Sequence, residues 1–163
     1  MSFEEIRVIT VVYLAVFLPL LVYFQNKTRL PSWVPTFYIV GVIVCALGWE
    51  LWFTYGWLDG NSVNLRRSEA LNNWLPKNIN WLMNSMGDAG AVLLGGAWIM
   101  WVSHKKDVRV FKEWKWSAFC ILLIWCIGQN VLVEMFLYHD QLAEGKPLSV
   151  SYTHLTLPTI CSV

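Results

Sequence analysis

Four long apolar stretches constrain this chain most strongly, because each is long enough to cross a lipid bilayer as a helix. They cover residues 6–24, 33–58, 79–102 and 116–138, to within a residue or two. A transmembrane helix needs about 20 mostly apolar residues, and a helix satisfies all of its backbone hydrogen bonds internally in lipid. Only 14% of the residues are charged, whereas soluble domains have about 25%. The sequence therefore predicts an all-α fold, a polytopic transmembrane helical bundle with four spans.

The connection between the second and third spans is the longest inside the predicted bundle. Residues 61–78 are polar and contain Arg66 and Arg67. Residues 68–75 either form one helix at the membrane interface, anchored by Trp74 and ended by Pro76, or remain a solvated loop. The sequence alone does not choose between these alternatives.

The distribution of Lys and Arg predicts how the bundle is oriented. Seven lie in the loops after the first and third spans, at Lys27, Arg29, Lys105, Lys106, Arg109, Lys112 and Lys115, and five lie on the other side, at Arg7, Arg66, Arg67, Lys77 and Lys146. Short cytoplasmic loops are enriched in these residues. We therefore expect a bacterial inner-membrane protein with residues 25–32 and 103–115 in the cytoplasm, and with the N-terminus and the region of residue 140 outside.

The last residues of the chain have the features of a foreign segment. Residues 150–159 read VSYTHLTLPT, which back-translates without strain into a sequence resembling the transposon-end adapter of shotgun sequencing libraries. The same adapter, continued through an index, accounts for residues 160–163 and a stop. We therefore expect residues 1–149 to be a single transmembrane domain truncated at its C-terminal end, and residues 150–163 to be adapter read-through. His154 and Cys161 then have no functional meaning.

The cysteines and the net charge exclude several classes of function. Cys45, Cys120 and Cys126 lie inside apolar stretches, without any C-x-x-C pair or zinc-type spacing. We expect them to be small buried hydrophobic residues, and no cofactor is identifiable. The formal net charge of +1 gives no reason to expect a nucleic-acid partner.

Three acidic residues lie within the predicted spans, where an ionised side chain costs about 2.5–3.5 kcal/mol at the membrane centre. Glu50 lies eight residues before the outer end of its span, Asp88 nine residues after the outer start, and Glu134 four residues before the outer end. At a rise of 1.5 Å per residue, their depths are about 12, 14 and 6 Å. The acids are thus predicted to lie in the outer half of the membrane.

Helical spacing places neutral polar residues beside these acids. Asn80, Asn84 and Asp88 recur every four residues, as do Asn130 and Glu134, with Gln129 adjacent, and Glu50 with Thr54. Residues four apart share one helix face. Gly87, Ala91 and Gly95 form a similar stripe of small residues, which lets a neighbouring helix approach closely. We predict one polar cluster made of Glu50, Asp88, Glu134, Asn84, Asn130 and Gln129.

The first functional hypothesis is a transport or permeation protein that binds a proton or cation at this polar cluster. The cytoplasmic halves of spans two to four are uniformly apolar, which argues against a continuous polar path. The first alternative is a structural or assembly subunit of an oligomer or membrane complex, in which the polar residues only join helices. On both hypotheses the lipid bilayer is the principal partner.

The second alternative is a metal-dependent membrane enzyme with its site at the outer face. Glu134, His139 and Asp140 lie close together in the sequence, and oxygen and imidazole ligands suit several divalent metals. No sequence motif specifies a reaction, so we do not expect an enzyme on present grounds.

Overall fold

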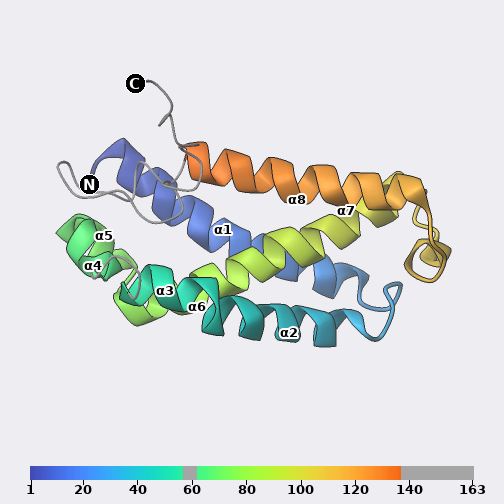
Figure 1. The fold of residues 1–163 in the computed structure, drawn as a ribbon, viewed down its shortest axis with the longest axis horizontal. Helices are drawn as coiled ribbons and strands as arrows, with labels where there is room; N and C mark the ends of the chain where they lie inside the picture. Colours follow the sequence, from blue (N-terminus) through green and yellow to red (C-terminus); the bar gives the residue numbers. More distant parts are fainter. Residues whose placement is uncertain (57–61, 137–163) are drawn as a thin grey trace, which may run out of the picture.

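The computed structural model describes residues 1–56 and 62–136, with side chains up to residue 133. The elements are α1 (Phe3–Asn26), α2 (Val34–Leu47), α3 (Trp49–Tyr55), α4 (Val63–Arg66), α5 (Glu69–Trp74), α6 (Lys77–Asp88), the π-helix η1 (Ala89–Gly95), α7 (Gly96–Ser103), the 3₁₀ helix η2 (Val108–Phe111) and α8 (Trp116–Phe136). Every element within these ranges is helical, which confirms the predicted all-α class (Figure 1).

Among the residues that the structure describes, three helices are long and apolar enough to cross a membrane, namely α1, the continuous path Lys77–Ser103 and α8. A fourth span exists if α2 and α3 are counted together, because they are bent by 40° at a short break. The span predicted over residues 33–58 is therefore present in the described residues as a bent pair of helices. The described part of the second span consists of two helices that meet at Gly48.

The path α6–η1–α7 lies at the centre of the bundle and contacts α1, α2, α3 and α8 (Figure 1). The stripe of small residues contributes to this packing, but it serves two neighbours rather than one. A Cβ built on Gly87 would lie 3.3 Å from the Cβ of Ala15 in α1, and one built on Gly95 would lie 3.3 Å from the ring of Trp125 in α8. Close helix packing through small residues is thus confirmed.

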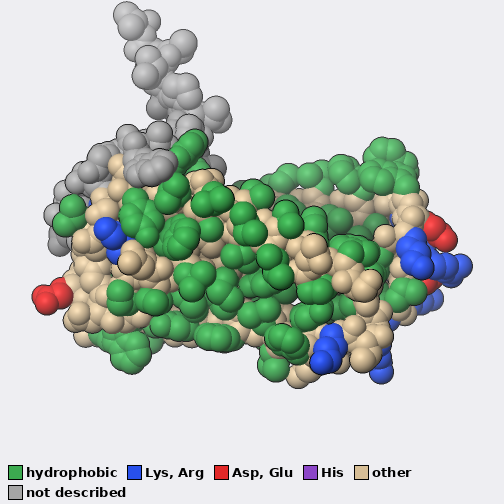
Figure 2. Space-filling model, turned by 90° about the horizontal axis from the view of Figure 1, so that it is seen from below, with side chains coloured by type: hydrophobic (Ala, Val, Ile, Leu, Met, Phe, Trp, Pro, Cys, Tyr) green, Lys and Arg blue, Asp and Glu red, His purple; other side chains and the backbone are tan. Residues whose placement is uncertain are grey.

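The surface between the two ends of the bundle is largely apolar, as Figure 2 shows for one face. Leu14, Phe17 and Leu21 of α1 and Ile124 of α8 are all exposed on the chain. Water would penalise such a continuous apolar surface, whereas lipid accommodates it. The surface therefore supports a membrane-embedded protein.

The same surface corrects the prediction for the cysteines. Cys120 is exposed, and Cys45 and Cys126 are only partly buried in the described chain. An apolar span predicts contact with an apolar medium, but it does not distinguish protein interior from lipid. Cys120 therefore faces outward although its surroundings in the sequence are apolar.

At one end of the bundle, α4 and α5 form a cap over α1, α3 and α6; we call this the cap end. Of the two alternatives for residues 68–75, the helix is the one observed. The Ser68 side chain begins α5 by accepting a hydrogen bond from the Leu71 N–H at 3.3 Å, and it also donates to Oε1 of Glu5 in α1. The Tyr13 hydroxyl donates to the Trp74 carbonyl at 3.3 Å. The cap is therefore tied to the first helix.

Candidate functional site

Glu50 lies directly after the break in the second span. The Gly48 N–H donates to the Val44 carbonyl at 3.0 Å, and a Cβ at Gly48 would lie only 2.8 Å from that oxygen. The break frees the Ala46 carbonyl, which accepts a hydrogen bond from Nε1 of Trp81 in α6 at 2.8 Å. A freed backbone group at membrane depth needs such a partner. The indole of Trp81 thus stabilises the bend beside Glu50.

The Glu50 carboxylate is almost completely buried, with 3% of the residue exposed. Its Oε2 accepts a hydrogen bond from the Thr54 hydroxyl at 3.3 Å, one turn further along α3. Thr54 is fully buried. The predicted pairing of Glu50 with Thr54 is therefore confirmed, and the structure places this pair inside the bundle rather than on its surface.

Asp88 lies at a second departure from α-helical geometry. It is the last residue of α6, and the π-helix η1 begins at Ala89. The carbonyls around this change are held from other helices: Nε1 of Trp125 donates to the Ala91 carbonyl at 2.8 Å, and the Tyr38 hydroxyl donates to the Met86 carbonyl at 3.3 Å. Isolated π-turns are frequent at functional sites.

The acids at the two irregularities both lie near Cys45 of α2. Both Asp88 and Glu50 lie close enough to the Cys45 thiol of α2 to act on it electrostatically. The helices that carry them are packed together, because α6 contacts both α2 and α3. We call the region where α2 and α3 meet α6 the joint. The structure therefore brings two of the three predicted acids to one side of the bundle.

The predicted polar stripe on α6 does not stay on one face. Asn80 is fully buried, Asn84 is partly buried, and Asp88 is exposed on the described chain. A spacing of four residues advances about 40° beyond a full turn, so two such steps rotate a side chain by about 80° around the helix. The stripe thus begins inside the cap end and reaches the surface at Asp88.

Two arginines that sequence reasoning assigned to a polar connection are buried. The guanidinium of Arg67 donates to Oδ1 of Asn72 at 2.8 Å, to Oδ1 of Asn80 at 2.8 Å and to the Leu75 carbonyl. Arg66 donates to the Phe53 carbonyl, and its Cζ lies 4.9 Å from the centre of the Phe53 ring. We call this pair the arginine clamp, because it fastens the cap to α3 and α6.

The arginine clamp has an electrostatic cost. Burial, together with the neighbouring charge of Arg66, lowers the pKa of Arg67 to about 10. A buried cation is tolerated only when its donors are satisfied, and the asparagines beside it supply the acceptors. The sequence signal that could have revealed the clamp is this density of asparagine around Arg66 and Arg67, at positions 64, 72, 73, 78 and 80.

The polar residues of α8 are placed apart from the joint. The main contacts of α8 are with α7 and η1, and Figure 1 shows it on the opposite side of the central path from α2 and α3. Gln129 is partly buried, and Asn130 is exposed, with its Nδ2 donating to the Cys126 carbonyl of its own helix at 3.0 Å. Asn130 thus forms its hydrogen bond within α8, and its membership of a single cluster stays a prediction. The side chain of Glu134 lies outside the described residues.

The candidate metal ligands cannot be assembled from the described chain. His139 and Asp140, like the Glu134 side chain, lie outside it. Within the described ranges, no three His, Cys, Asp or Glu side chains lie close enough together to hold a metal ion. The Nδ1 of His104 is within 2.8 Å of the Met100 carbonyl, and its Nε2 is within 2.9 Å of the Ser117 hydroxyl.

Comparisons of the chain with protein-family models, with curated proteins and with solved structures found no match.

Proposed function

We propose that this chain is a multi-pass protein of the bacterial inner membrane that binds a proton or a cation at Glu50 and Asp88 and acts in transport or permeation. The observation that supports the proposal most is the coincidence of each acid with a break in helical geometry. Glu50 follows the bend at Gly48, and Asp88 precedes the π-helix. Transporters bind ions at interrupted helices near the bilayer midplane.

The energetics of membrane acids support the same proposal. Each carboxylate at this depth costs about 2.5–3.5 kcal/mol, so two acids on one side of the bundle need a compensating role. Glu50 lies inside the bundle and Asp88 at its surface. A proton or a small cation could be held between an interior acid and an accessible one, since neighbouring carboxylates readily share a positive charge.

The orientation that we propose places the cap end outside the cell. The opposite end, formed by residues 25–32 and 104–115, has seven Lys and Arg residues; we call it the basic end. Figure 2 shows several Lys and Arg side chains gathered at one end of the molecule, next to the largely apolar surface between the two ends. A cytoplasmic position for the basic end follows the enrichment of Lys and Arg in short cytoplasmic loops.

The proposal is tested by measuring ion flux in liposomes that contain the purified full chain. Proton and monovalent-cation flux are recorded for the wild type and for the Glu50→Gln and Asp88→Asn variants. Glu113→Gln is the control, because Glu113 is an exposed acid at the basic end. We expect flux to fall at least about tenfold in both variants, as for the loss of a membrane-embedded binding group, and to be unchanged in Glu113→Gln.

Two results would contradict the proposal. One is wild-type flux no greater than that of empty liposomes under every imposed gradient. The other is flux that is equal in the wild type, Glu50→Gln and Asp88→Asn while all three proteins remain folded by circular dichroism.

A structural or assembly subunit is the second candidate, and the exposure of Asp88 favours it. A carboxylate on the surface of the described chain at membrane depth would be stabilised by a partner helix that covers it. On this hypothesis, Asp88→Asn dissociates a complex isolated from membranes, whereas Glu50→Gln alters only the stability of the chain. Crosslinking in intact membranes, compared between the two variants, separates the two candidates.

A further inference from the structure

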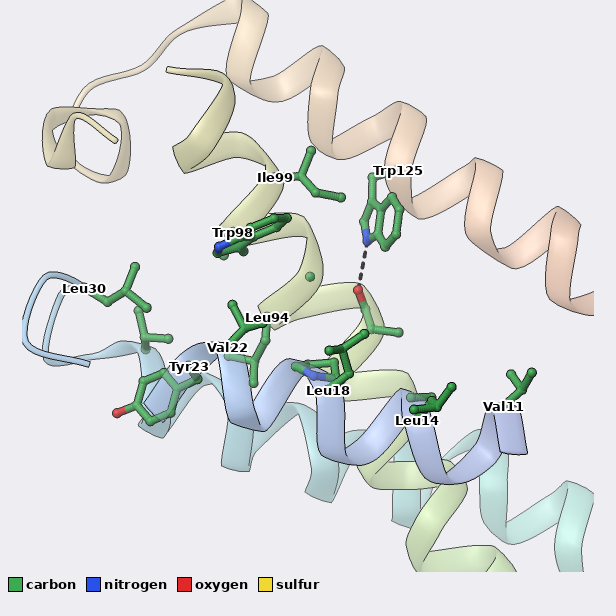
Figure 3. Close-up of a pocket in the computed structure, with 16 residues that line it drawn as sticks. Val11, Leu14, Leu18, Val22, Tyr23, Leu30, Leu94, Trp98, Ile99 and Trp125 are labelled. Carbon is green, nitrogen blue, oxygen red and sulfur yellow. Dashed lines mark hydrogen bonds between the residues drawn. The ribbon is translucent and has the colours of Figure 1, made fainter. Parts of the chain in front are cut away.

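A long apolar groove opens on the side of the bundle where α1, η1, α7 and α8 meet. Its volume is about 460 Å³. The residues that carry the argument are Leu14, Leu18 and Val22 of α1, Leu94 of η1, Trp98 of α7 and Trp125 of α8 (Figure 3). Pockets for small ligands have volumes of about 300–1,000 Å³, so the groove is large enough for a ligand.

The groove extends along one half of the membrane. On α1 its lining runs from Val11 to Tyr23 and then continues to Leu30 in the following loop. At a rise of 1.5 Å per residue, the α1 part is about 18 Å long, close to half of the roughly 30 Å hydrocarbon thickness. The groove therefore matches a single leaflet, on the side of the basic end.

Leu30 connects the groove to the charges of the basic end. It lines the groove and also packs against the core formed by Met100, Trp101, Val110 and Ala118. Lys27 and Arg29, in the same loop, are exposed. The basic end has seven cationic side chains but only two acids, Asp107 and Glu113, and Asp107 is paired with Arg109 at 2.7 Å. The apolar groove thus ends next to the basic end, where positive charges outnumber negative ones.

We propose that this groove binds an anionic phospholipid, with one acyl chain along α1 and the headgroup at Lys27 and Arg29. An acyl chain suits the apolar lining and the one-leaflet length. An anionic headgroup also matches the surplus of positive charge beyond Leu30, which a second apolar helix would not match. Basic residues at a membrane surface attract anionic headgroups by about 1 kcal/mol each.

Native mass spectrometry of the full chain tests the site proposed for the acyl chain. The protein is released from detergent that contains equal amounts of phosphatidylglycerol and phosphatidylcholine with identical acyl chains. We expect one retained lipid in the wild type, predominantly phosphatidylglycerol. Leu18→Trp fills the groove and should lose that lipid. Leu21→Trp is the matched control, because Leu21 is on the same helix and equally exposed, 55% against 53%, but does not line the groove.

The double variant Lys27→Gln/Arg29→Gln tests the headgroup site. Loss of two charges should reduce the preference for phosphatidylglycerol over phosphatidylcholine on the order of tenfold or more, while a lipid is still retained. Lys77→Gln at the cap end should leave the preference unchanged. Melting temperatures measured with and without each lipid give a second readout for the same variants.

Three outcomes would overturn the proposal. The first is equal lipid retention by Leu18→Trp and Leu21→Trp. The second is equal binding of the two lipids by the wild type. The third is a dimer that Leu18→Trp abolishes and Leu21→Trp retains, which would assign the groove to a second copy of the chain.

Discussion

The joint and α8 both have polar side chains at membrane depth, yet the structure treats them differently. At the joint, the carboxylate of Glu50 is buried beside Thr54, and the backbone bends at Gly48. On α8, Asn130 is exposed and bonds to its own helix. Both side chains bond within their own helix, so the two regions differ in burial and in backbone geometry: Glu50 is buried beside a bend, whereas Asn130 is exposed on a regular helix.

The support at the joint comes from side chains of neighbouring helices. Trp81 holds the carbonyl that the bend at Gly48 frees, and the arginine clamp fastens the cap above it. By contrast, the only hydrogen bond donated by the Asn130 side chain in the described structure goes to its own helix. An alanine substitution at Gly48 of the joint should therefore have a larger destabilising effect than the equivalent substitution at Gly128 of α8.

The largest expected effect is that of Arg67→Ala, which tests whether the cap is fastened as the structure indicates. The substitution leaves the acceptors of Asn72, Asn80 and Leu75 unsatisfied in a buried position. We expect the free energy of unfolding in mixed micelles to fall by about 3 kcal/mol. Arg29→Ala, at an exposed residue of the basic end, should change it by less than about 0.5 kcal/mol. Equal effects of the two would contradict the arginine clamp.

Alanine substitutions of two glycines compare the joint directly with α8. In Gly48→Ala the new Cβ would lie 2.8 Å from the Val44 carbonyl, and we expect a loss of about 2 kcal/mol. At Gly128 of α8 a Cβ meets none of the described residues within 4 Å, so Gly128→Ala should stabilise the helix by about 0.5–1 kcal/mol. Thermal unfolding of both variants in the same detergent checks whether the melting temperature falls in Gly48→Ala and rises in Gly128→Ala. A stabilising Gly48→Ala would show that the bend is not required.

Tryptophan-to-phenylalanine substitutions test how far the indoles of Trp81 and Trp125 support the Ala46 and Ala91 carbonyls. Trp81→Phe and Trp125→Phe each remove a 2.8 Å hydrogen bond to a backbone carbonyl, and each should lower the free energy of unfolding by about 1 kcal/mol. Trp116→Phe is the control, since Trp116 is largely exposed. If all three variants unfold at the same denaturant concentration, the indole bonds contribute nothing.

The smallest effect on stability is expected for Asp107→Asn at the basic end, away from both the joint and the polar residues of α8. Hydrogen bonds from the side chain and backbone of Arg109 hold the pKa of Asp107 at about 2, below its ordinary value of 3.8. A lowered pKa contributes stability that is present above the ordinary value and is lost as pH falls towards 2. Asp107→Asn should therefore unfold with a weaker pH dependence than the wild type between pH 4 and 2. The Asp107 carboxyl signal, followed by NMR, reports the pKa itself.

Parts of the joint were predictable because they depend on local periodicity. The spacing of four residues predicts that Glu50 and Thr54 meet, whereas the sequence left open whether residues 68–75 form a helix or a loop. The break was not predictable. Gly41 and Gly48 both lie in the second span, yet α2 continues through Gly41 and ends before Gly48. Gly41 is closely approached by Leu93 of η1, whereas the bend at Gly48 is supported by the hydrogen bond from Trp81 to the Ala46 carbonyl.

The sequence by itself determined the helical class, the approximate spans and the enrichment of Lys and Arg at one end, because hydrophobicity and charge act residue by residue against lipid and water. Only the tertiary structure decided that Arg66 and Arg67 point inward, that Asp88 reaches the surface while Asn80 does not, and that Asn130 is separated from Glu50. These outcomes depend on helix rotation and on partners distant in the chain, such as Trp81 for Ala46, which no local pattern encodes.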